Sequence, residues 1–366
     1  MFRKTDSTPQ LDMFENVSNH LSKRGAKKYD DPQGWHNQFY NLVTSKIDED
    51  VFSPLFTSGS GRTGAPNASV RQLVALSILK EGYGCSDESL FEKCEFDLLT
   101  RKALGLVHLG DKVVSLDTWY LFRRRICEYD ELHGVNLMEL CFSQVTGEQA
   151  RQFNISGKTV RMDSKLIGSN IAHYSRYELI HGTFCHEMQS VGILSRLNPS
   201  LRKRVEIFLG EDAQKTVYRS SGEVIAERIT LLGQVIYEVL VRIKAGDGSL
   251  LWRVFHEQYT VDKGKAAARE KGEITASSLQ NHNDPDAHYR QKGDQRVKGY
   301  STNITETIDG ETGKPGLIVD VQVKPATAPD NGFVQDAVKA SRDVTGDTVE
   351  TVIADGAYQG PDNRDF

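Results

Sequence analysis

The chain has 366 residues, of which 38% are hydrophobic and 26% are charged, an ordinary composition for a soluble globular protein with room for two domains. No apolar run approaches the roughly 20 residues needed to cross a bilayer, and no signal-peptide core follows the first residues, so we expect a cytoplasmic protein without membrane contacts. The formal net charge of −5 excludes a global attraction to nucleic acid and leaves only local basic surfaces for binding it.

The first 34 residues are polar and are predicted to form a flexible arm. Their basic cluster consists of Lys23, Arg24, Lys27 and Lys28. This cluster is either a solvated tail or a set of phosphate contacts. Residues 59–66 form a Gly-rich loop that lacks the GK[ST] ending of a phosphate-binding loop, so we assign no nucleotide site there.

Residues 35–150 are predicted to form a helical domain, because apolar side chains recur at helical spacing. The expected buried faces are Val70, Leu73, Val74 and Ile78 in one helix, Leu90, Cys94 and Leu98 in a second, and Trp119, Phe122, Ile126 and Tyr129 in a third. Residues 86–88 signal the start of the second helix, and Ser115 or Asp117 that of the third. The basic run of this third helix, on its other side, is Arg123, Arg124 and Arg125. These arginines either position DNA through its phosphates or form a solvated face.

Residues 159–170 have strand character, with Gly157 before them and Gly168 near their end. Asp163 lies within or at the edge of this strand, where Asp is disfavoured. Lys165 follows two residues later on the same strand face, as a candidate phosphate contact or as a solvent-facing lysine.

A helical insertion is predicted over about residues 171–260. Its longest helix carries Ile225, Ile229, Leu232, Ile236, Val239 and Ile243. A shorter partner helix carries Leu201, Val205 and Phe208. The start of that partner is basic, with Arg202, Lys203 and Arg204. The helix dipole disfavours these charges and a DNA backbone would reward them, so the insertion is a candidate for DNA contact or for dimerisation.

Two groups of residues invite a metal interpretation. His181, Cys185 and His186 lie together in the insertion, and His282 lies between two asparagines. Neither group has a second ligand cluster with matching spacing, so a chance grouping is favoured. The five cysteines have no CxxC spacing, which argues against a disulfide framework and a zinc ribbon.

The sheet is predicted to resume with a hairpin over residues 299–308 and 317–323, with a turn at 309–313. A helix over about residues 331–342 then leads into a strand that ends at Asp355. Catalytic groups gather at the carboxyl ends of neighbouring strands, which lie roughly 4.8 Å apart, so Asp163 and Asp355 could hold a divalent ion together. Mg²⁺ prefers such carboxylates, and paired ions drive phosphoryl transfer. The alternative is a strand-end Asp and an ordinary Asp-Gly turn.

Several segments, taken in order, resemble the catalytic domain of bacterial insertion-sequence transposases of the DDE class: VRMDSKLIGSNIA, NDPDAHYRQKG, KGYSTN and VIADGAYQG. Upstream, SVRQLVALSILKEGYGCSDESLFEKCEFDLLTRKALGL and SLDTWYLFRRRI resemble the helical amino-terminal domain of the same enzymes. The resemblance runs from about Trp35 to the last residue. It implies an α/β fold, in which a helical N-terminal domain is followed, over residues 151–366, by an incomplete ribonuclease-H-like mixed sheet with a helical insertion after its first strand.

The resemblance also implies that Asp163 is the first catalytic acid and Asp355 the second, and that both hold Mg²⁺ (or Mn²⁺). The third acid of the family is a Glu on a helix well downstream. This chain stops at Phe366, eleven residues past Asp355, so we expect the C-terminal part of the domain and that Glu to be missing.

The implied function is DNA transposition. A homo-oligomer in the bacterial nucleoid would cleave double-stranded DNA at the terminal inverted repeats of the element, and the freed 3′-hydroxyl would attack target DNA. Two alternatives stay open. One is a catalytically inactive, truncated transposase that only binds DNA or oligomerises, and the other is a ribonuclease-H-like nuclease that nicks without joining strands.

Overall fold

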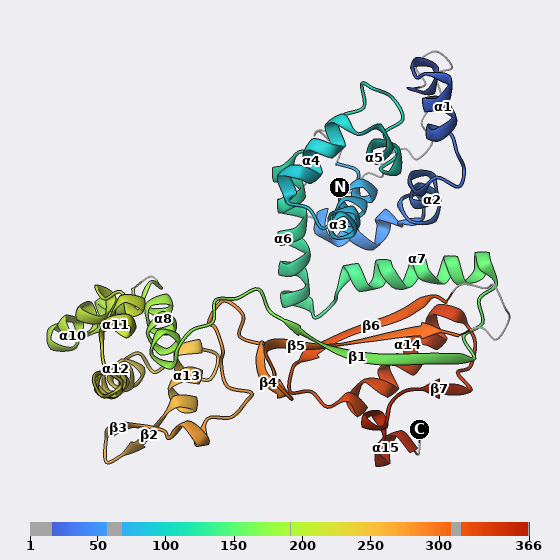
Figure 1. Ribbon diagram of the computed structural model, residues 1–366. Coiled ribbons are helices and arrows are strands. Elements are labelled where there is room, and N and C mark those ends of the chain that lie inside the picture. The colour runs from blue at the N-terminus through green and yellow to red at the C-terminus, as the bar shows by residue number, and fades with distance from the viewer. Residues whose placement is uncertain (1–16, 57–67, 191, 309–315, 365) are drawn as a thin grey trace. The chain divides into compact units, whose positions relative to one another are not determined.

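The computed structural model describes residues 17–56, 68–190, 192–308, 316–364 and 366 (Figure 1). The predicted Gly-rich loop at 59–66 and the hairpin turn at 309–313 lie outside these residues. The chain divides into two compact units. Unit 1 comprises the residues up to Arg161, Thr305–Asp320 and Val338–Ile353, and unit 2 comprises Met162–Ile304, Val321–Ala337 and Ala354–Phe366.

Unit 1 begins with helices. They are α1 (Lys23–Tyr29), α2 (Trp35–Leu42), α3 (Val70–Tyr83), α4 (Asp87–Phe96), α5 (Leu98–Ala103), α6 (Leu116–His133) and α7 (Leu137–Phe153). Capping side chains fix the ends of α3 and α6. The hydroxyls of Ser69 and Ser115 accept hydrogen bonds from the first turns, and Gly84 and Gly134 end the helices with φ values of 59° and 64°. The start predicted at Ser115 is therefore confirmed.

The helices of unit 1 enclose one hydrophobic core. Its fully buried members include Phe52, Leu73, Leu76, Leu90, Leu104 and Trp119. Two sequence predictions about these helices were wrong. Ile78 is 40% exposed, and Leu98 starts α5 instead of continuing α4. The reason for the second error is Asp97, whose carboxylate accepts a hydrogen bond from the Leu99 amide and caps a new helix.

Helix α1 lies within the residues predicted to be an arm and carries its four basic side chains. Its last residue, Tyr29, is buried, and Lys102 of α5 lies over the Tyr29 ring, 3.8 Å from the centroid. The ammonium group of Lys102 also contacts the carboxylate of Asp30 at 3.1 Å. These contacts attach the end of α1 to the helical core of unit 1.

A five-stranded mixed sheet follows the helices. Its strands are β1 (Thr159–Gly168), β4 (His288–Lys292), β5 (Gln295–Thr307), β6 (Ile318–Pro325) and β7 (Thr351–Ile353). The order is β4-β5-β1-β7, and β6 also pairs with β5. Hydrogen bonds from Thr307 to Leu317 and from Ala326 to Gly299 make β5 and β6 an antiparallel hairpin, whereas β1 and β7 are parallel. The predicted order of strand, insertion, hairpin, helix and strand is confirmed, with the helix, α14, at Val334–Thr345.

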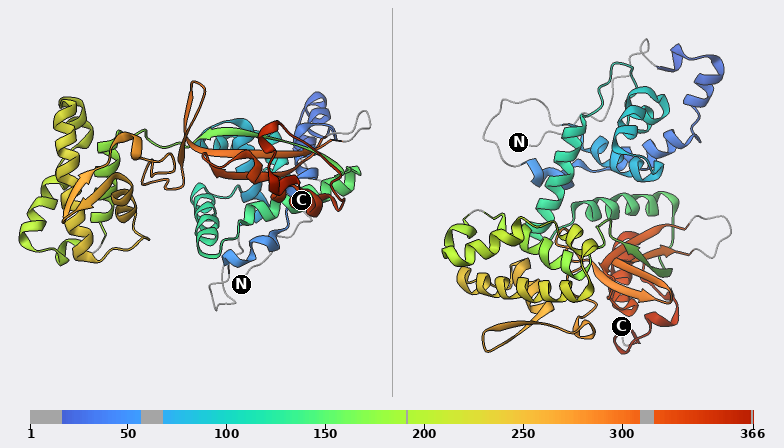
Figure 2. Two further views of the ribbon diagram at one scale, coloured as in Figure 1. Left: turned by 90° about the horizontal axis from the view of Figure 1, so that it is seen from below. Right: turned by 60° about the vertical axis from the view of Figure 1, so that its left-hand side comes forward.

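The helical insertion after β1 belongs to unit 2 (Figure 2). It contains α8 (Arg176–Met188), α9 (Ile193–Arg196), α10 (Pro199–Leu209), α11 (Ala213–Arg219), α12 (Gly222–Ile243), α13 (Leu250–Gln258), β2 (Tyr259–Asp262) and β3 (Lys265–Ala268). It has its own core, which includes Phe184, Val205, Leu232, Ile236, Val239 and Phe255. The long helix and its shorter partner, predicted from periodicity, are α12 and α10.

One close approach in this core requires a glycine. A Cβ atom at Gly233, in the middle of α12, would lie 2.2 Å from Cε1 of Tyr259. The Tyr259 hydroxyl donates a hydrogen bond to the Ile229 carbonyl at 2.8 Å, which holds the ring in place. The glycine therefore gives up helix propensity so that the aromatic ring can pack against the helix backbone.

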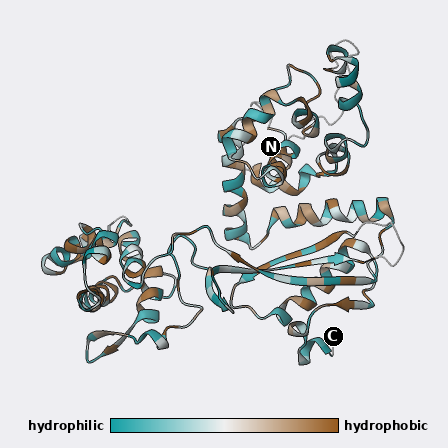
Figure 3. Ribbon diagram, viewed as in Figure 1, coloured by the Kyte–Doolittle hydropathy of each residue, from teal (hydrophilic) through white to brown (hydrophobic). Residues whose placement is uncertain are grey.

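The structure is thus mixed α/β, with a helical N-terminal region and a helical insertion after the first strand of the sheet, as expected. Hydrophobic and hydrophilic residues both occur along the long helices, which is typical of helices with one buried face (Figure 3). Among the residues that the structure describes, no helix combines the length and the apolar character needed to cross a membrane.

Candidate active site

The two predicted acids follow the parallel pairing of β1 with β7. Arg161 pairs with Ile353, the last residue of β7, and Asp163 and Asp355 each come two residues later. The charges of both aspartates act on the hydroxyl of Tyr358, so the fold brings both carboxylates near this ring. Both aspartates are exposed and both belong to unit 2. Lys165 is also exposed, and it shares the strand face of Asp163, whereas Val160 and Met162 on the other face are buried.

A one-turn 3₁₀ helix, Gly356–Tyr358, holds Asp355 in position. Asp355 caps this turn, because one of its carboxylate oxygens accepts a hydrogen bond from the Ala357 amide at 2.8 Å. Tyr358 closes the turn and is almost fully buried, and its hydroxyl donates to the side-chain oxygen of Asn303 on β5 at 2.8 Å. The Asp355 turn is therefore anchored to the centre of the sheet.

The charges of three carboxylates act on the Tyr358 hydroxyl. The pKa of Tyr358 is raised to about 12, mainly by burial; a hydrogen bond with Ser164 opposes this, and the charges of Asp330, Asp163 and Asp355 add to it. Ser164, the neighbour of Asp163, donates a hydrogen bond to Asp330 at 2.9 Å. Asp330 begins the 3₁₀ turn that precedes α14. Residues from β1, from this turn and from the Asp355 turn thus meet around one buried phenol.

The end of β1 is fixed by a second group of contacts. Asp284, in the loop before β4, accepts hydrogen bonds from the hydroxyl of Ser169 and from that of Tyr300 on β5. Burial raises the pKa of Tyr300, and the hydrogen bond to Asp284 and the charge of Asp284 raise it further. Asp284 therefore connects the segments NDPDAHYRQKG and KGYSTN to the strand that carries Asp163.

The carboxylates of Asp163 and Asp355 are suitable ligands for a hard divalent cation. In the part of the chain that the structure describes, no group of three or more His, Cys, Asp or Glu side chains is placed to share a metal ion. The donors at the strand ends are carboxylate oxygens of Asp163 and Asp355. Mg²⁺ usually takes one or two protein carboxylates and leaves its other positions to water and substrate phosphate. The exposed carboxylates of Asp163 and Asp355 are ligands of the kind that Mg²⁺ or Mn²⁺ takes.

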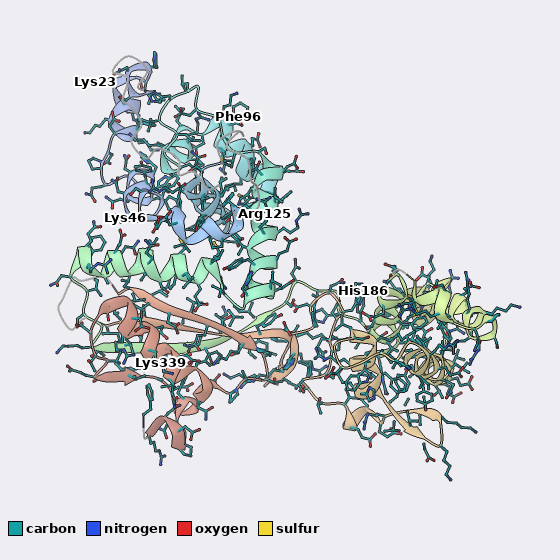
Figure 4. The ribbon with its side chains drawn as sticks, turned by 180° about the vertical axis from the view of Figure 1, so that it is seen from behind. Lys23, Lys46, Phe96, Arg125, His186 and Lys339 are labelled. Carbon is teal, nitrogen blue, oxygen red and sulfur yellow. The ribbon has the colours of Figure 1, made fainter. Side chains whose placement is uncertain are left out.

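The basic residues proposed for DNA contact lie on β1, which carries Lys165, and on α6 and α10. On α6, Arg123 and Arg124 are exposed and Arg125 is partly buried (Figure 4). Arg123 lies over the Trp119 ring, and Arg124 pairs with Glu128. On α10, Arg202 pairs with Glu206 at 2.9 Å, Arg204 makes a two-point contact with Glu238, and Lys203 is exposed. Neighbouring acids thus neutralise part of both basic runs.

The histidines and the cysteine that invited a metal interpretation do not form one group in the structure. The buried ring of His181 contacts the Phe208 carbonyl at 2.7 Å, and its neighbour Cys185 lies 3.7 Å from it. His186, which Figure 4 labels on α8, instead lies beside His282, with 5.2 Å between the ring centroids. Burial lowers the pKa of His282, and the charge of His186 lowers it further.

Sequence reasoning did not single out the residues that support the two aspartates. They are Ser164, Asp284, Tyr300, Asn303, Asp330 and Tyr358. Most of them lie in or beside the four segments that carried the family resemblance, which was the one available signal. Their hydrogen bonds join residues that are far apart in the chain, so no local pattern indicates the pairs.

The comparisons with known proteins bear on the N-terminal region. Residues 12–125 match a family model described as a transposase domain (DUF772). No curated protein and no solved structure matches the chain. The matched range contains α1 to α5 and most of α6, including the two upstream segments for which a transposase resemblance was predicted. The N-terminal region of the chain is therefore similar to a transposase domain.

Proposed function

We propose that the chain is a DDE-class DNA transposase of an insertion sequence, which uses Mg²⁺ or Mn²⁺ to cleave DNA and to transfer the 3′-end to a target. The observation that carries this proposal is that two exposed aspartates, Asp163 and Asp355, each follow the parallel pair of Arg161 and Ile353 by two residues. In α/β sheets, catalytic groups gather towards the carboxyl ends of neighbouring strands. The transposase family match upstream supports the same function.

Asp163 and Asp355 are the proposed metal ligands and catalytic acids. A bound divalent cation supplies charge neutralisation at the phosphate and a more acidic water. The chain itself supplies position, since the hydrogen bond from Ser164 to Asp330 fixes the strand next to Asp163, and that from Tyr358 to Asn303 fixes the Asp355 turn. Lys165, on the face of Asp163, is a proposed phosphate contact.

The proposed partners are the terminal inverted repeats of the element and the target DNA, bound by a homo-oligomer. The basic runs on α6 and α10 are proposed to contact phosphates. Their acidic neighbours do not prevent this, because exposed ion pairs contribute only about 0–1 kcal/mol and can exchange partners.

The test measures metal binding and cleavage separately. Mn²⁺ binding is followed by electron paramagnetic resonance, and cleavage on a labelled duplex with a terminal inverted repeat. We expect D163N and D355N to lose both, while affinity for DNA stays within about tenfold, or 1.4 kcal/mol. The matched control is D343N, which removes an exposed carboxylate from α14. Unchanged Mn²⁺ binding in either site variant removes that residue from the site, and metal binding without any cleavage favours a protein that only binds DNA.

A further inference from the structure

A second candidate site lies within unit 2, where the insertion meets β4 and β5. It is a cavity of about 680 Å³, within the usual range for ligand sites. Three cationic side chains line it, from Arg176, Lys271 and Lys298, and none of the described residues that line it is an acid. Two tyrosines, Tyr174 and Tyr289, also contribute to the wall.

Neutral groups hold the first of these cations. The guanidinium group of Arg176 donates to the side-chain oxygen of Gln258 at 2.9 Å and to the backbone carbonyl of the same residue at 3.0 Å. Burial lowers the pKa of Arg176, against a smaller opposing effect of Tyr259 and Glu270. The arginine is thus oriented by an amide rather than neutralised by a hydrogen-bonded carboxylate.

Lys298 is likewise held by a neutral group. Its ammonium group donates to the Tyr174 carbonyl at 3.4 Å, and burial lowers its pKa. Partial burial of a cation without a carboxylate in hydrogen-bond contact costs free energy, which an anionic ligand would recover. Arg176 and Lys298 are two such cations in one cavity, although the charge of Glu270 acts on Arg176, and together they point to an anion as the ligand.

The position of the cavity connects it to the strand that carries Asp163. The carbonyl of Lys298 accepts a hydrogen bond from the amide of Ser169, six residues beyond Asp163 along the chain. At about 3.3 Å per residue, this distance is roughly 20 Å. A DNA strand engaged at Asp163 can cover that distance with a few nucleotides.

We propose that this cavity binds one nucleotide of single-stranded DNA, with its phosphate held by Arg176 and Lys298 and its base against the tyrosine side chains. The cavity is much larger than a free phosphate requires, and aromatic walls beside cations are the usual means of binding single strands. The inference rests on the proposed function, because it takes DNA as the substrate.

The test is fluorescence anisotropy with a labelled single-stranded oligonucleotide and a labelled duplex as separate probes, and with inorganic phosphate as a competitor. K298Q should weaken single-strand binding roughly tenfold or more, because a hydrogen bond between charged groups is lost. The salt dependence of binding should fall by about 0.7 in slope, the value for one phosphate contact on a single strand. The matched control is K292Q, which removes an exposed charge from β4 outside the cavity lining and should leave the affinity nearly unchanged.

Crosslinking keeps the test independent of folding, because Arg176 also holds Gln258 and its substitution could disturb the insertion. An oligonucleotide with photoreactive bases should crosslink wild-type protein at Tyr174 or Tyr289, as identified by peptide mass spectrometry. Equal losses in K298Q and K292Q, equal losses for duplex and single strand, or binding of inorganic phosphate alone would each overturn the proposal. Mn²⁺ binding at Asp163 and Asp355 should be unaffected by K298Q, so failure here and failure of the proposed function are distinguishable.

Discussion

Substitution of Glu211 by Gln tests how much a buried ion pair stabilises the insertion. The side chain of Glu211 is only 7% exposed and lies between α10 and α11. It accepts hydrogen bonds from the Tyr177 hydroxyl at 2.7 Å and from Nε of Arg228 on α12 at 2.9 Å, and a second guanidinium nitrogen of Arg228 contacts its other oxygen. Burial alone would raise the pKa of Glu211, but the hydrogen bonds from Arg228, Tyr177 and Thr216 outweigh it and lower the pKa from 4.5 to about 2.

This pKa predicts both the size and the pH range of the effect. Each pKa unit corresponds to about 1.4 kcal/mol, so the ionised carboxylate of Glu211 contributes roughly 3 kcal/mol to folding. Because the folded pKa lies below the unfolded one, the contribution is complete above the unfolded value of 4.5 and is lost as the pH falls towards 2. We therefore expect E211Q to lose about 3 kcal/mol of unfolding free energy at neutral pH, and a difference from wild type that shrinks in acid.

Urea unfolding followed by circular dichroism measures this difference at each pH. The control is E206Q on α10, whose carboxylate is 51% exposed and pairs with the equally exposed Arg202. Such a surface pair contributes about 0–1 kcal/mol, so E206Q should unfold nearly as wild type does. The reasoning fails if E211Q and E206Q have the same midpoint, or if the deficit of E211Q stays constant as the pH is lowered.

Three further results are expected. Y358F should lower the unfolding free energy by about 1–3 kcal/mol, because Asn303 loses a buried partner, and should weaken Mn²⁺ binding; an unchanged urea midpoint would contradict this. G233A should destabilise by about 1–3 kcal/mol through the clash with Tyr259, whereas a gain in stability would mean that helix propensity outweighs packing. His282 should titrate below its ordinary pKa of 6.5 in a proton NMR titration, so stability should rise with pH through the range just below that value; titration at or above 6.5 would refute the burial argument.

The spacing of apolar residues and the capping and turn residues were sufficient to predict the main helices and strands. The apolar spacing in α12, the capping serine of α6 and the alternation in β5 and β6 are local signals, and each produced the expected element. The order of elements along the chain, with strand, insertion, hairpin, helix and strand, was predicted from the same signals. The adjacency of Asp163 and Asp355 stays a prediction; the structure shows the parallel pairing of Arg161 with Ile353, two residues before each aspartate.

Elements with weak local signals were missed. Strand β4 is half exposed and polar, and β2 and β3 have only four residues each. None of the three shows a clear alternation of apolar and polar residues. The supporting residues of the candidate site were missed for a different reason. Tyr358 and Asn303 are 55 residues apart, and Ser164 and Asp330 are 166 apart, so only the folded chain brings them together.

The insertion also has a consequence for how the protein folds. Strands β1 and β5 are neighbours in the sheet, yet the whole insertion separates them in sequence. Closing a disordered loop of that length costs conformational entropy before any strand pairing is gained, and such non-local contacts slow folding. Because the insertion has its own hydrophobic core, it can fold first and shorten the effective loop. The order of folding would then run from the insertion to the sheet.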